Sequence, residues 1–342
     1  MKAPARPNRR ATARDVAKLA ECSVATVSMV VNGKSAGRMN PATEERVWQA
    51  VRQLDYRVNS TASALARGEP NTIAMVCPDP TNPFFSLVLD GVMSGLGETL
   101  SLNLVAPSGG EDYGASTVER AMSGDIAGLI LASPGQLLFG DLTPTCPTIV
   151  LDAEGQYKNF VTINLDIASA ARELAAHLVK LGHRRVAYFG LERDKDTLLH
   201  RRDELRQELV AQDADFVIPD IMVKRLSVDA AHDEIIANWS MLLDAAVTAV
   251  VCGDDLLAYG FMAAAREKGI NIPQDISIAS FNNLPYSAMT SPGLTSVDLS
   301  ARELGTRAIA ALRNMIDHRD VPASTMVRSQ LVIRQSTGAA HL

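Results

Sequence analysis

Apolar residues recur at helical spacing in two short stretches near the start of the chain. One stripe is formed by Val16, Leu19 and Ala20 and the other by Val27, Val30 and Val31, with the polar turn 21–23 between them. Ser23 is placed to cap the second helix through its side-chain oxygen. Two such helices bury little surface between them, which favours a helix-turn-helix that presents its second helix to a groove. A helical hairpin packed on another element is the alternative interpretation.

A third helix and then a change of composition follow this pair. Pro41 precedes acidic residues, which indicates a helix that runs to about Leu54 and closes a three-helix core over 12–56. The segment 59–68 is small, polar and rich in alanine, and about ten residues are too few to hold a helix alone. The sequence Gly-Glu-Pro-Asn at 68–71 breaks the chain, so we predict a domain boundary near residue 70.

Short apolar runs alternate with amphipathic stretches from Thr72 onward. The runs are TIAMVC (72–77), LNLVA (102–106), GLILA (128–132), TIVLD (148–152), RVAYFG (185–190), AVVCG (249–253) and ISIASF (276–281). They have the length of buried parallel strands, and the spacing of apolar residues over 167–181 predicts a helix that Gly182 ends. This alternation predicts a doubly wound α/β architecture, which over such a length is better explained by two lobes with a cleft between them.

The charge is divided between the two parts of the chain. Residues 1–70 hold 12 Lys and Arg against 6 Asp and Glu, whereas the remainder holds 21 against 33. A basic head on an acidic body indicates that only the head meets a polyanion; a solvated basic tail is the alternative. No apolar run approaches the roughly 18 residues of a membrane helix, and the basic N-terminus lacks the apolar part of a secretion signal. The four cysteines stand far apart, which favours free thiols in a reducing compartment and a cytoplasmic protein.

Motifs for catalysis are absent from the sequence. No GxGxxG follows a strand, no GxSxG occurs, and the tripeptide GKS at 33–35 lacks the leading glycine of a P-loop. His183 is interpreted as a helix-end residue. Asp254 and Asp255 follow a predicted strand, where adjacent carboxylates more often cap the next helix or hydrogen-bond a ligand. Because no nucleophile, base and orienting group come together, we predict no enzyme, no catalytic residue, no cofactor and no metal.

Several motifs that are weak alone occur together in a specific order. They are Asp15-Val16-Ala17, Val24-Ala25-Thr26-Val27-Ser28, Val30-Val31-Asn32-Gly33, Thr43-Glu44-Glu45-Arg46-Val47, Leu54-Asp55-Tyr56, then Ala62, Leu65 and Ala66, Pro78-Asp79, Asn82-Pro83-Phe84-Phe85, Leu181-Gly182-His183-Arg184-Arg185, Gly253-Asp254-Asp255, Ile272-Pro273-Gln274-Asp275-Ile276-Ser277 and Leu294-Thr295-Ser296-Val297. On these motifs the chain resembles the lactose-repressor (LacI/GalR) family of bacterial transcription regulators, from about Thr12 to Arg334.

The resemblance implies an α/β fold: an N-terminal all-α helix-turn-helix headpiece, then a two-lobed core of doubly wound parallel sheets like a periplasmic sugar-binding protein. The implied parts are a basic disordered arm at 1–11, the headpiece at 12–57, a hinge helix and linker at 58–70, the effector-binding and dimerisation core at 71–335, and a tail at 336–342. Such regulators are homodimers on palindromic double-stranded operator DNA, and a small effector in the cleft switches their affinity. We expect a repressor, and a dimer rather than a tetramer, because 335–340 offers no apolar repeat.

The resemblance also assigns DNA-binding positions. Val24, Ala25 and Met29 match base-reading residues; the first two lack hydrogen-bonding groups and would contact thymine methyl groups. Met29 stands where many relatives carry an arginine, so the half-site should differ from the family's common one. Short polar side chains suited to phosphate contacts, or alternatively to capping, are those of Thr12, Ser23, Thr26, Ser28 and Asn32. The hinge contributes Asn59, Ala62 and Leu65, of which Leu65 matches the wedge that opens a central base step.

Effector contacts are implied in both lobes. They match Phe84 and Phe85 in the first lobe, Ser133 and Asp152 near the crossover, and Arg201, Asp254 and Asn282 in the second lobe. Arg201 can fork onto hydroxyls or an anionic group, and Asp254 with Asn282 can take paired hydroxyls. Asn282 replaces a common carboxylate, Glu204 a common glycine and Leu299 a common glutamine, so the expected ligand is a carbohydrate, polyol or nucleoside without closer definition.

Three other functions compete with a repressor at this point. A solute-binding protein would share the core, but it needs a secretion signal and has no use for a basic headpiece. An activator would use the same parts, because either sign of regulation needs only differential affinity between two states. An enzyme on an α/β fold would reveal itself by turnover of a bound sugar.

Overall fold

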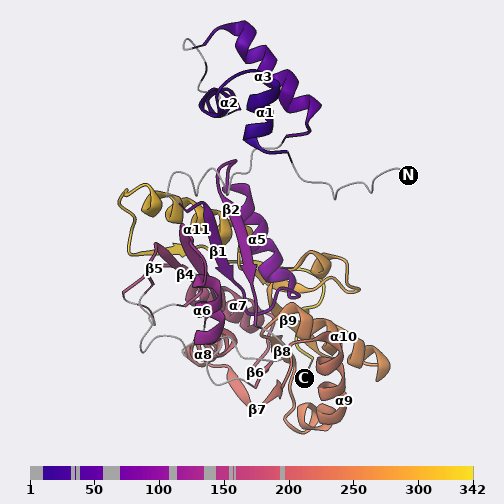
Figure 1. Cartoon of the computed structure of the whole chain (residues 1–342). Helices are drawn as coiled ribbons and strands as arrows, with labels where there is room; N and C mark the ends of the chain where they lie inside the picture. The colour runs from indigo at the N-terminus through magenta and orange to yellow at the C-terminus, as the bar shows by residue number, and fades with distance from the viewer. Residues whose placement is uncertain are drawn as a thin grey trace, which may run out of the picture. The chain divides into compact units, whose positions relative to one another are not determined.

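The chain forms two compact units, Met1–Asn71 and Thr72–Leu342, which are described separately (Figure 1). This computed structural model describes residues 11–31, 35, 39–56, 70–107, 114–134, 144–153, 157, 159–192 and 197–341, without the side chains of 216–220. The hinge predicted over 59–67 lies outside the described residues.

The described part of the first unit is helical and has one small core. Its helices are α1 (Ala13–Leu19), α2 (Val24–Val31) and α3 (Pro41–Gln53). Each helix contributes a fully buried valine to this core, namely Val16, Val27 and Val47. The predicted three-helix core is therefore confirmed for the described residues, and α3 begins at the proline that signalled it.

The turn between α1 and α2 is closed by backbone geometry. Glu21 has a left-handed conformation (φ 50°), and the Cys22 N–H donates to the carbonyl of Ala17, a bond that ends a helix abruptly. Arg46 Nε of α3 donates to the Ala20 carbonyl at 3.4 Å and so holds the third helix against this turn. The direction in which α2 leaves the turn is thus fixed by bonds to both of the other helices.

The second unit contains two six-stranded sheets. Sheet A has the order β11-β5-β4-β3-β1-β2, is parallel throughout, and consists of β1 (Thr72–Val76), β2 (Ser101–Val105), β3 (Gly128–Ala132), β4 (Thr148–Leu151), β5 (Val161–Leu165) and β11 (Ser324–Val327). Sheet B has the order β12-β10-β9-β8-β6-β7 and consists of β6 (Arg185–Leu191), β7 (Asp215–Val223), β8 (Ala249–Cys252), β9 (Ser277–Asn282), β10 (Thr295–Asp298) and β12 (Gln330–Val332). Among the strands that the structure describes, only β12 runs antiparallel, beside β10. The predicted fold class is confirmed.

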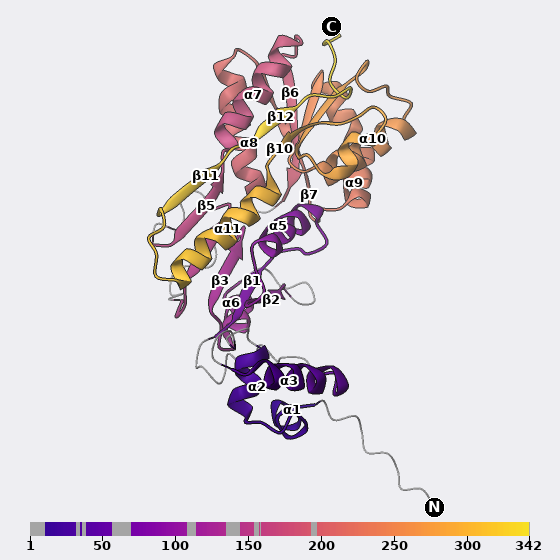
Figure 2. The same ribbon diagram turned by 90° about the horizontal axis from the view of Figure 1, so that it is seen from above.

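Helices cover both faces of each sheet, which explains why the strands are apolar runs rather than alternating ones. The helices are α5 (Pro83–Ser94), α6 (Ala115–Met122), α7 (Ile167–Lys180), α8 (Thr197–Ala211), α9 (Val228–Asp244), α10 (Asp255–Glu267) and α11 (Ala301–Ile316), with a 3₁₀ turn η1 (Pro285–Ala288). In β1, Ile73 and Met75 pack with α5 and α11, whereas Ala74 and Val76 pack with α6 on the opposite face. Figure 2 shows α5 and α11 side by side along sheet A.

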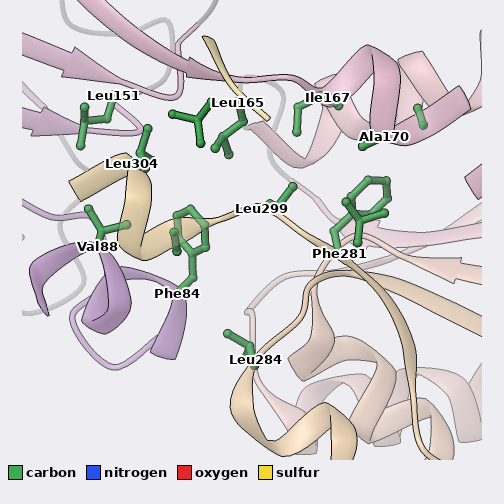
Figure 3. Close-up of a cluster of buried hydrophobic side chains, with 14 of the residues drawn as sticks. Phe84, Val88, Leu151, Leu165, Ile167, Ala170, Phe281, Leu284, Leu299 and Leu304 are labelled. Atoms are coloured by element: carbon green, nitrogen blue, oxygen red, sulfur yellow. The ribbon is translucent and has the colours of Figure 1, made fainter. Parts of the chain in front are cut away.

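One hydrophobic cluster runs through both lobes (Figure 3). It includes Phe84 and Val88 from α5, Ile167 from α7 and Phe281 from sheet B, and it passes through Leu299, where the chain crosses back from β10 to α11. Because this cluster contains residues of both sheets, the two lobes share a continuous apolar core at their junction.

All seven predicted strands are present within a residue or two of their expected ends, but five strands were missed. They are β5, β7, β10, β11 and β12. In β10, Thr295 and Ser296 are fully buried, and Ser296 Oγ donates to Asp255 Oδ1 at 2.7 Å. Buried polar residues whose hydroxyls are hydrogen-bonded give no apolar signal in the sequence, so such strands escape pattern-based prediction.

The C-terminal segment 336–341, which the sequence set apart as a tail, packs against sheet B. Ser336 is fully buried; its hydroxyl donates to the Ile278 carbonyl at 2.6 Å and accepts from the Thr295 N–H at 2.8 Å. His183, just after α7, lies with Nε2 3.0 Å from the Gly338 carbonyl oxygen. This segment is held by hydrogen bonds rather than by apolar side chains. A pattern of apolar residues in the sequence therefore could not predict that it packs against the sheet.

Candidate DNA-reading helix and interlobe site

Helix α2 has one buried and one exposed face in the described part of the first unit. Val27 and Val30 are buried, whereas Val24 keeps 44% of its surface exposed and Ala25 and Ser28 are also exposed. Met29, the third predicted base-reading residue, is half-buried at the border of the two faces. The start of α2 therefore offers a small apolar surface that the core of the unit does not use.

The polar residues predicted to contact phosphates also cap helices. Thr12 forms a capping box with Asp15: the Thr12 N–H donates to Asp15 Oδ2 at 2.8 Å, and the Asp15 N–H donates to Thr12 Oγ1 at 3.4 Å. Ser23 Oγ accepts from the Thr26 N–H at 3.0 Å, which confirms the predicted cap of α2, and lies 2.9 Å from Thr26 Oγ1. A phosphate oxygen accepts, so a contact with it requires a free O–H. One hydroxyl of the Ser23–Thr26 pair has such an O–H, whereas the Thr12 O–H donates to Asp15 Oδ2 at 2.7 Å. The phosphate contacts stay a prediction.

Four of the predicted DNA-binding residues lie outside the described residues. They are Asn32, which follows α2, and Asn59, Ala62 and Leu65 of the expected hinge. Their roles therefore rest on the sequence alone.

Four polar side chains meet where the two lobes of the core come together. Asn82, Arg201, Asp254 and Asn282, which we name the interlobe cluster, are each at most 4% exposed. Asp254 Oδ2 accepts from Asn82 Nδ2 at 3.1 Å and from Asn282 Nδ2 at 2.7 Å. Arg201 Nη1 donates to Asn282 Oδ1 at 3.1 Å and to the Gly253 carbonyl at 2.7 Å. The cluster thus joins the first lobe, through the N-cap of α5, to α8 and to the ends of β8 and β9.

The orientation of both amides in the cluster follows from their other bonds. Asn82 Oδ1 accepts the Phe84 N–H at 2.9 Å and so caps α5, which turns Nδ2 toward Asp254. Asn282 Oδ1 faces the guanidinium of Arg201, which leaves its Nδ2 for the same carboxylate. Asp254 Oδ1 caps α10 by accepting the Leu256 N–H at 2.8 Å. Every amide and carboxylate oxygen in the cluster therefore has a donor.

The two adjacent carboxylates differ in environment. Burial raises the pKa of Asp254, against the opposing influence of the Leu256 N–H, the Arg201 charge and the two amides. Burial raises the pKa of Asp255 to about 6, although it accepts bonds from the hydroxyls of Ser280, Ser287 and Ser296. Asp255 Oδ2 also accepts the Leu284 N–H at 2.6 Å. Asp255 thus fastens β9, η1 and β10 to α10, whereas Asp254 belongs to the interlobe cluster.

Left-handed backbone conformations gather at the carboxyl ends of the strands. Ser133 (φ 45°) follows β3, Asp152 (φ 52°) follows β4, and Asn282 (φ 112°) ends β9 with Asn283 (φ 50°) after it. Ser133 Oγ donates to Asp152 Oδ2 at 3.2 Å. Each non-glycine residue held in such a conformation costs about 1–3 kcal/mol, and such residues concentrate at functional sites. The edges of both sheets that carry the predicted effector residues are therefore also where the backbone is strained.

Phe84 and Phe85, the aromatic residues predicted to contact the effector, belong to the hydrophobic cluster and not to the interlobe cluster. Phe84 is buried in the cluster of Figure 3, and its ring meets that of Phe85 edge-on with 5.2 Å between centroids. Leu299, which replaces a common glutamine, is fully buried in the same cluster and offers no polar group. Arg201 lies with its guanidinium carbon 5.7 Å from the centre of the Phe281 ring, which supports its buried charge.

The structure thus brings three predicted effector residues, Arg201, Asp254 and Asn282, into one cluster and joins Ser133 to Asp152. Sequence reasoning missed Asn82 as a site residue. Its signal was the Asn-Pro pair at 82–83, because asparagine followed by proline is typical of a helix start, and a helix start after a parallel strand lies at the ligand-binding edge.

A small helical unit with an outward-facing second helix, followed by two doubly wound lobes with polar residues at their junction, defines a DNA-binding regulator with a ligand-binding core. Residues 12–59 match the family described as "Bacterial regulatory proteins, lacI family", and residues 175–337 match the "Periplasmic binding protein-like domain". The chain belongs to the LacI family of bacterial transcription regulators.

Relatives of similar length support this assignment. The chain is 29% identical over 344 residues to a helix-turn-helix transcriptional regulator from the aml 5′ region of Streptomyces limosus, covering 94% of this chain and 93% of the relative. It is 28% identical to the transcriptional repressor PurR of Vibrio atlanticus, covering 96% and 98%. A lac repressor dimer bound to operator and the anti-inducer ONPF shares the fold with a TM-score of 0.79 at 23% identity, covering 97% of this chain and 100% of that one. These relatives are regulators of transcription.

The described residues were also compared with the requirements of a membrane span and of a metal site. None of their helices is both long enough and apolar enough to cross a membrane. Within the same residues, no three His, Cys, Asp or Glu side chains are grouped as a metal site would require, and all four cysteines are thiols.

Proposed function

We propose that this LacI-family protein is a repressor that binds a palindromic operator as a homodimer and changes its affinity when a carbohydrate, polyol or nucleoside enters the core. The observation that carries the proposal is that one chain holds both an α2 start facing away from its core and a buried cluster of hydrogen-bonding groups between two lobes. The name of the related PurR and the operator-bound state of the structurally similar lac repressor support it. Because its proposed partner is chromosomal DNA, we propose that the protein acts in the cytoplasm.

Base reading would begin at α2. Val24 and Ala25 are exposed and apolar, so they suit thymine methyl groups in the major groove. Thr12, Ser23, Thr26, Ser28 and Asn32 would set the register through phosphates. Because Met29 cannot form a bidentate bond to guanine, the headpiece alone would discriminate weakly, and the hinge wedge Leu65 would supply much of the selectivity.

Effector recognition would use the interlobe cluster. Hydroxyl groups both donate and accept, so a pair of them suits the Asp254 carboxylate beside the Arg201 guanidinium. Arg201 Nε is buried without a hydrogen-bond partner, which leaves a donor for an effector oxygen. Ser133 and Asp152 would contact the opposite end of the ligand, and the ring of Phe85 would cover an apolar face.

A selection of bound fragments from genomic DNA, made with the purified chain, tests the DNA half of the proposal. We expect two-fold symmetric sites that lie upstream of genes for uptake or breakdown of the effector. The recovered sites are then used with a metabolite panel, in which one sugar, polyol or nucleoside should change the operator affinity. Recovery of fragments without two-fold symmetry contradicts the dimeric operator, and release by a compound outside these classes contradicts the proposed ligand.

A further inference from the structure

One hydrogen bond ties the two lobes of the core together at the proposed effector site. Asn82 Nδ2 donates to Asp254 Oδ2 at 3.1 Å, although the two residues lie 172 positions apart in the chain. Asn82 is the N-cap of α5 beside sheet A, and Asp254 is the N-cap of α10 beside sheet B. The bond therefore connects the first turns of two helices that belong to different lobes.

Each side chain of this pair uses one of its oxygens to cap its own helix. Asn82 Oδ1 is committed to the Phe84 N–H and Asp254 Oδ1 to the Leu256 N–H. The remaining atoms, Nδ2 of the amide and Oδ2 of the carboxylate, face each other, and both residues are at most 4% exposed. A hydrogen bond between an amide and a carboxyl group in such a buried place is stronger than one at the surface.

Asp254 Oδ2 is also one of the two carboxylate oxygens that an effector hydroxyl could bind. It already accepts two donors, Asn82 Nδ2 and Asn282 Nδ2, which fill the two lone-pair directions of one carboxylate oxygen. A hydroxyl on this oxygen must displace one of them. Asn282 belongs to the same lobe and is held by Arg201, whereas Asn82 belongs to the other lobe and leaves when the lobes separate.

We propose that Asn82 is a latch between the lobes, which holds them together and competes with the effector for Asp254. The latch follows from the geometry of the bond alone, whereas the competition rests on the proposed function, in which Asp254 binds the effector. The affinity of the core for its effector is then set partly by the strength of a bond within the chain. Effector entry breaks that bond and changes how the lobes are joined.

Hydrogen–deuterium exchange of the full chain tests the latch. Asn82→Ser keeps a good helix cap but removes the amide donor, because the serine hydroxyl ends one atom short of the position of Asn82 Nδ2. Asp254→Asn keeps the cap of α10 but places an amide N–H donor opposite the Asn82 N–H donor. We expect peptides covering 77–86 and 252–258 to exchange at least about tenfold faster in both variants, the lower limit for loss of a hydrogen bond to a charged group. Adding Asn82→Asp to Asp254→Asn restores an amide–carboxylate pair with reversed direction and should return the exchange toward the wild-type rate.

A matched control separates the latch from the loss of a cap. Asn40 caps α3 by accepting the Ala42 N–H at 2.9 Å and is also followed by proline, but it is exposed and lies in the first unit. Asn40→Ser should leave the exchange of both core peptides unchanged. Wild-type exchange in Asn82→Ser, or failure of Asn82→Asp to slow exchange in the Asp254→Asn background, overturns the latch.

Calorimetric titration with D-ribose, D-glucose and ribitol tests the competition. Removal of the competing donor in Asn82→Ser should tighten binding of whichever of these binds the wild type, by up to about tenfold. Weaker or unchanged binding overturns the competition, and weaker binding identifies Asn82 as an effector contact. If none of the three binds either protein while exchange responds as expected, the latch stands and the proposed effector class is refuted for these compounds.

Discussion

Replacement of Val24 by alanine separates DNA reading from folding. Val24 begins α2 with 44% of its surface exposed, whereas Val27, one turn later in the same helix, is fully buried. If the start of α2 enters the major groove, the exposed part of Val24 becomes buried against DNA. The substitution should then weaken operator binding and leave the stability of the headpiece nearly unchanged.

The size of the effect of Val24→Ala follows from the exposed fraction. Valine exceeds alanine by two carbon groups, each worth about 0.8 kcal/mol when fully buried. Since 44% of the residue is exposed, burial against DNA recovers about 0.7 kcal/mol per protomer. A homodimer on two half-sites doubles this to about 1.4 kcal/mol, which is about tenfold in Kd.

Fluorescence anisotropy with a selected operator duplex measures the affinity of the Val24→Ala variant, and urea unfolding followed by circular dichroism measures its stability. The control is Val27→Ala, the same change on the buried face, which should cost about 2 kcal/mol of stability through lost burial and a cavity. An unchanged Kd for Val24→Ala would refute the reading role of the α2 start. So would a loss of stability equal to that of Val27→Ala.

Three other substitutions test separate parts of the structure. Leu65→Ala should weaken specific operator binding in a gel shift while calorimetry finds the core as stable as before, because Leu65 is expected to act only on DNA; unchanged operator affinity would contradict the wedge. Gly305→Ala sets a methyl group against the Val88 carbonyl, where α11 and α5 touch, and should lower the free energy of unfolding by about 3 kcal/mol, whereas Gly124→Ala, in open space, should not. The pKa of Asp255 in the folded protein is about 6, above its ordinary value of 3.8. Below pH 3.8 the carboxyl is protonated in both the folded and the unfolded state, and its burial costs no stability. Above pH 6 it is ionised in both states, and the free energy of unfolding is lower by about 3 kcal/mol. The urea midpoint of the wild type should therefore fall between about pH 4 and 6 relative to that of Asp255→Asn, and parallel profiles would show that burial does not govern this carboxyl.

The architecture could largely be predicted because most of its buried positions are apolar. The stripes of α1 and α2, the proline of α3 and the apolar runs of the central strands all reflect burial directly. Strand β10 and the segment after β12 could not be found in this way, because Thr295, Ser296 and Ser336 are buried with their hydroxyls bonded to other elements. Such partners lie far away in the sequence.

The site could be predicted only in part. The resemblance to a family predicted Arg201, Asp254 and Asn282 as effector contacts, and in the structure these three side chains are joined by hydrogen bonds. It could not give the bond from Asn82, which depends on how two lobes meet. Nor could adjacent carboxylates be assigned separate roles from sequence, because only the geometry shows that Asp255 faces three hydroxyls of its own lobe while Asp254 faces the other lobe.

The central claim is that the chain reads a two-fold symmetric DNA sequence. It is tested most directly by the ratio of Kd values for a selected symmetric duplex and for a duplex of the same composition with one half-site scrambled, measured with the purified chain at one salt concentration near 0.15 M. A dimer that reads both half-sites should bind the symmetric duplex at least about a thousandfold more tightly. A ratio close to one at that salt concentration would show binding through charge alone and would contradict the account.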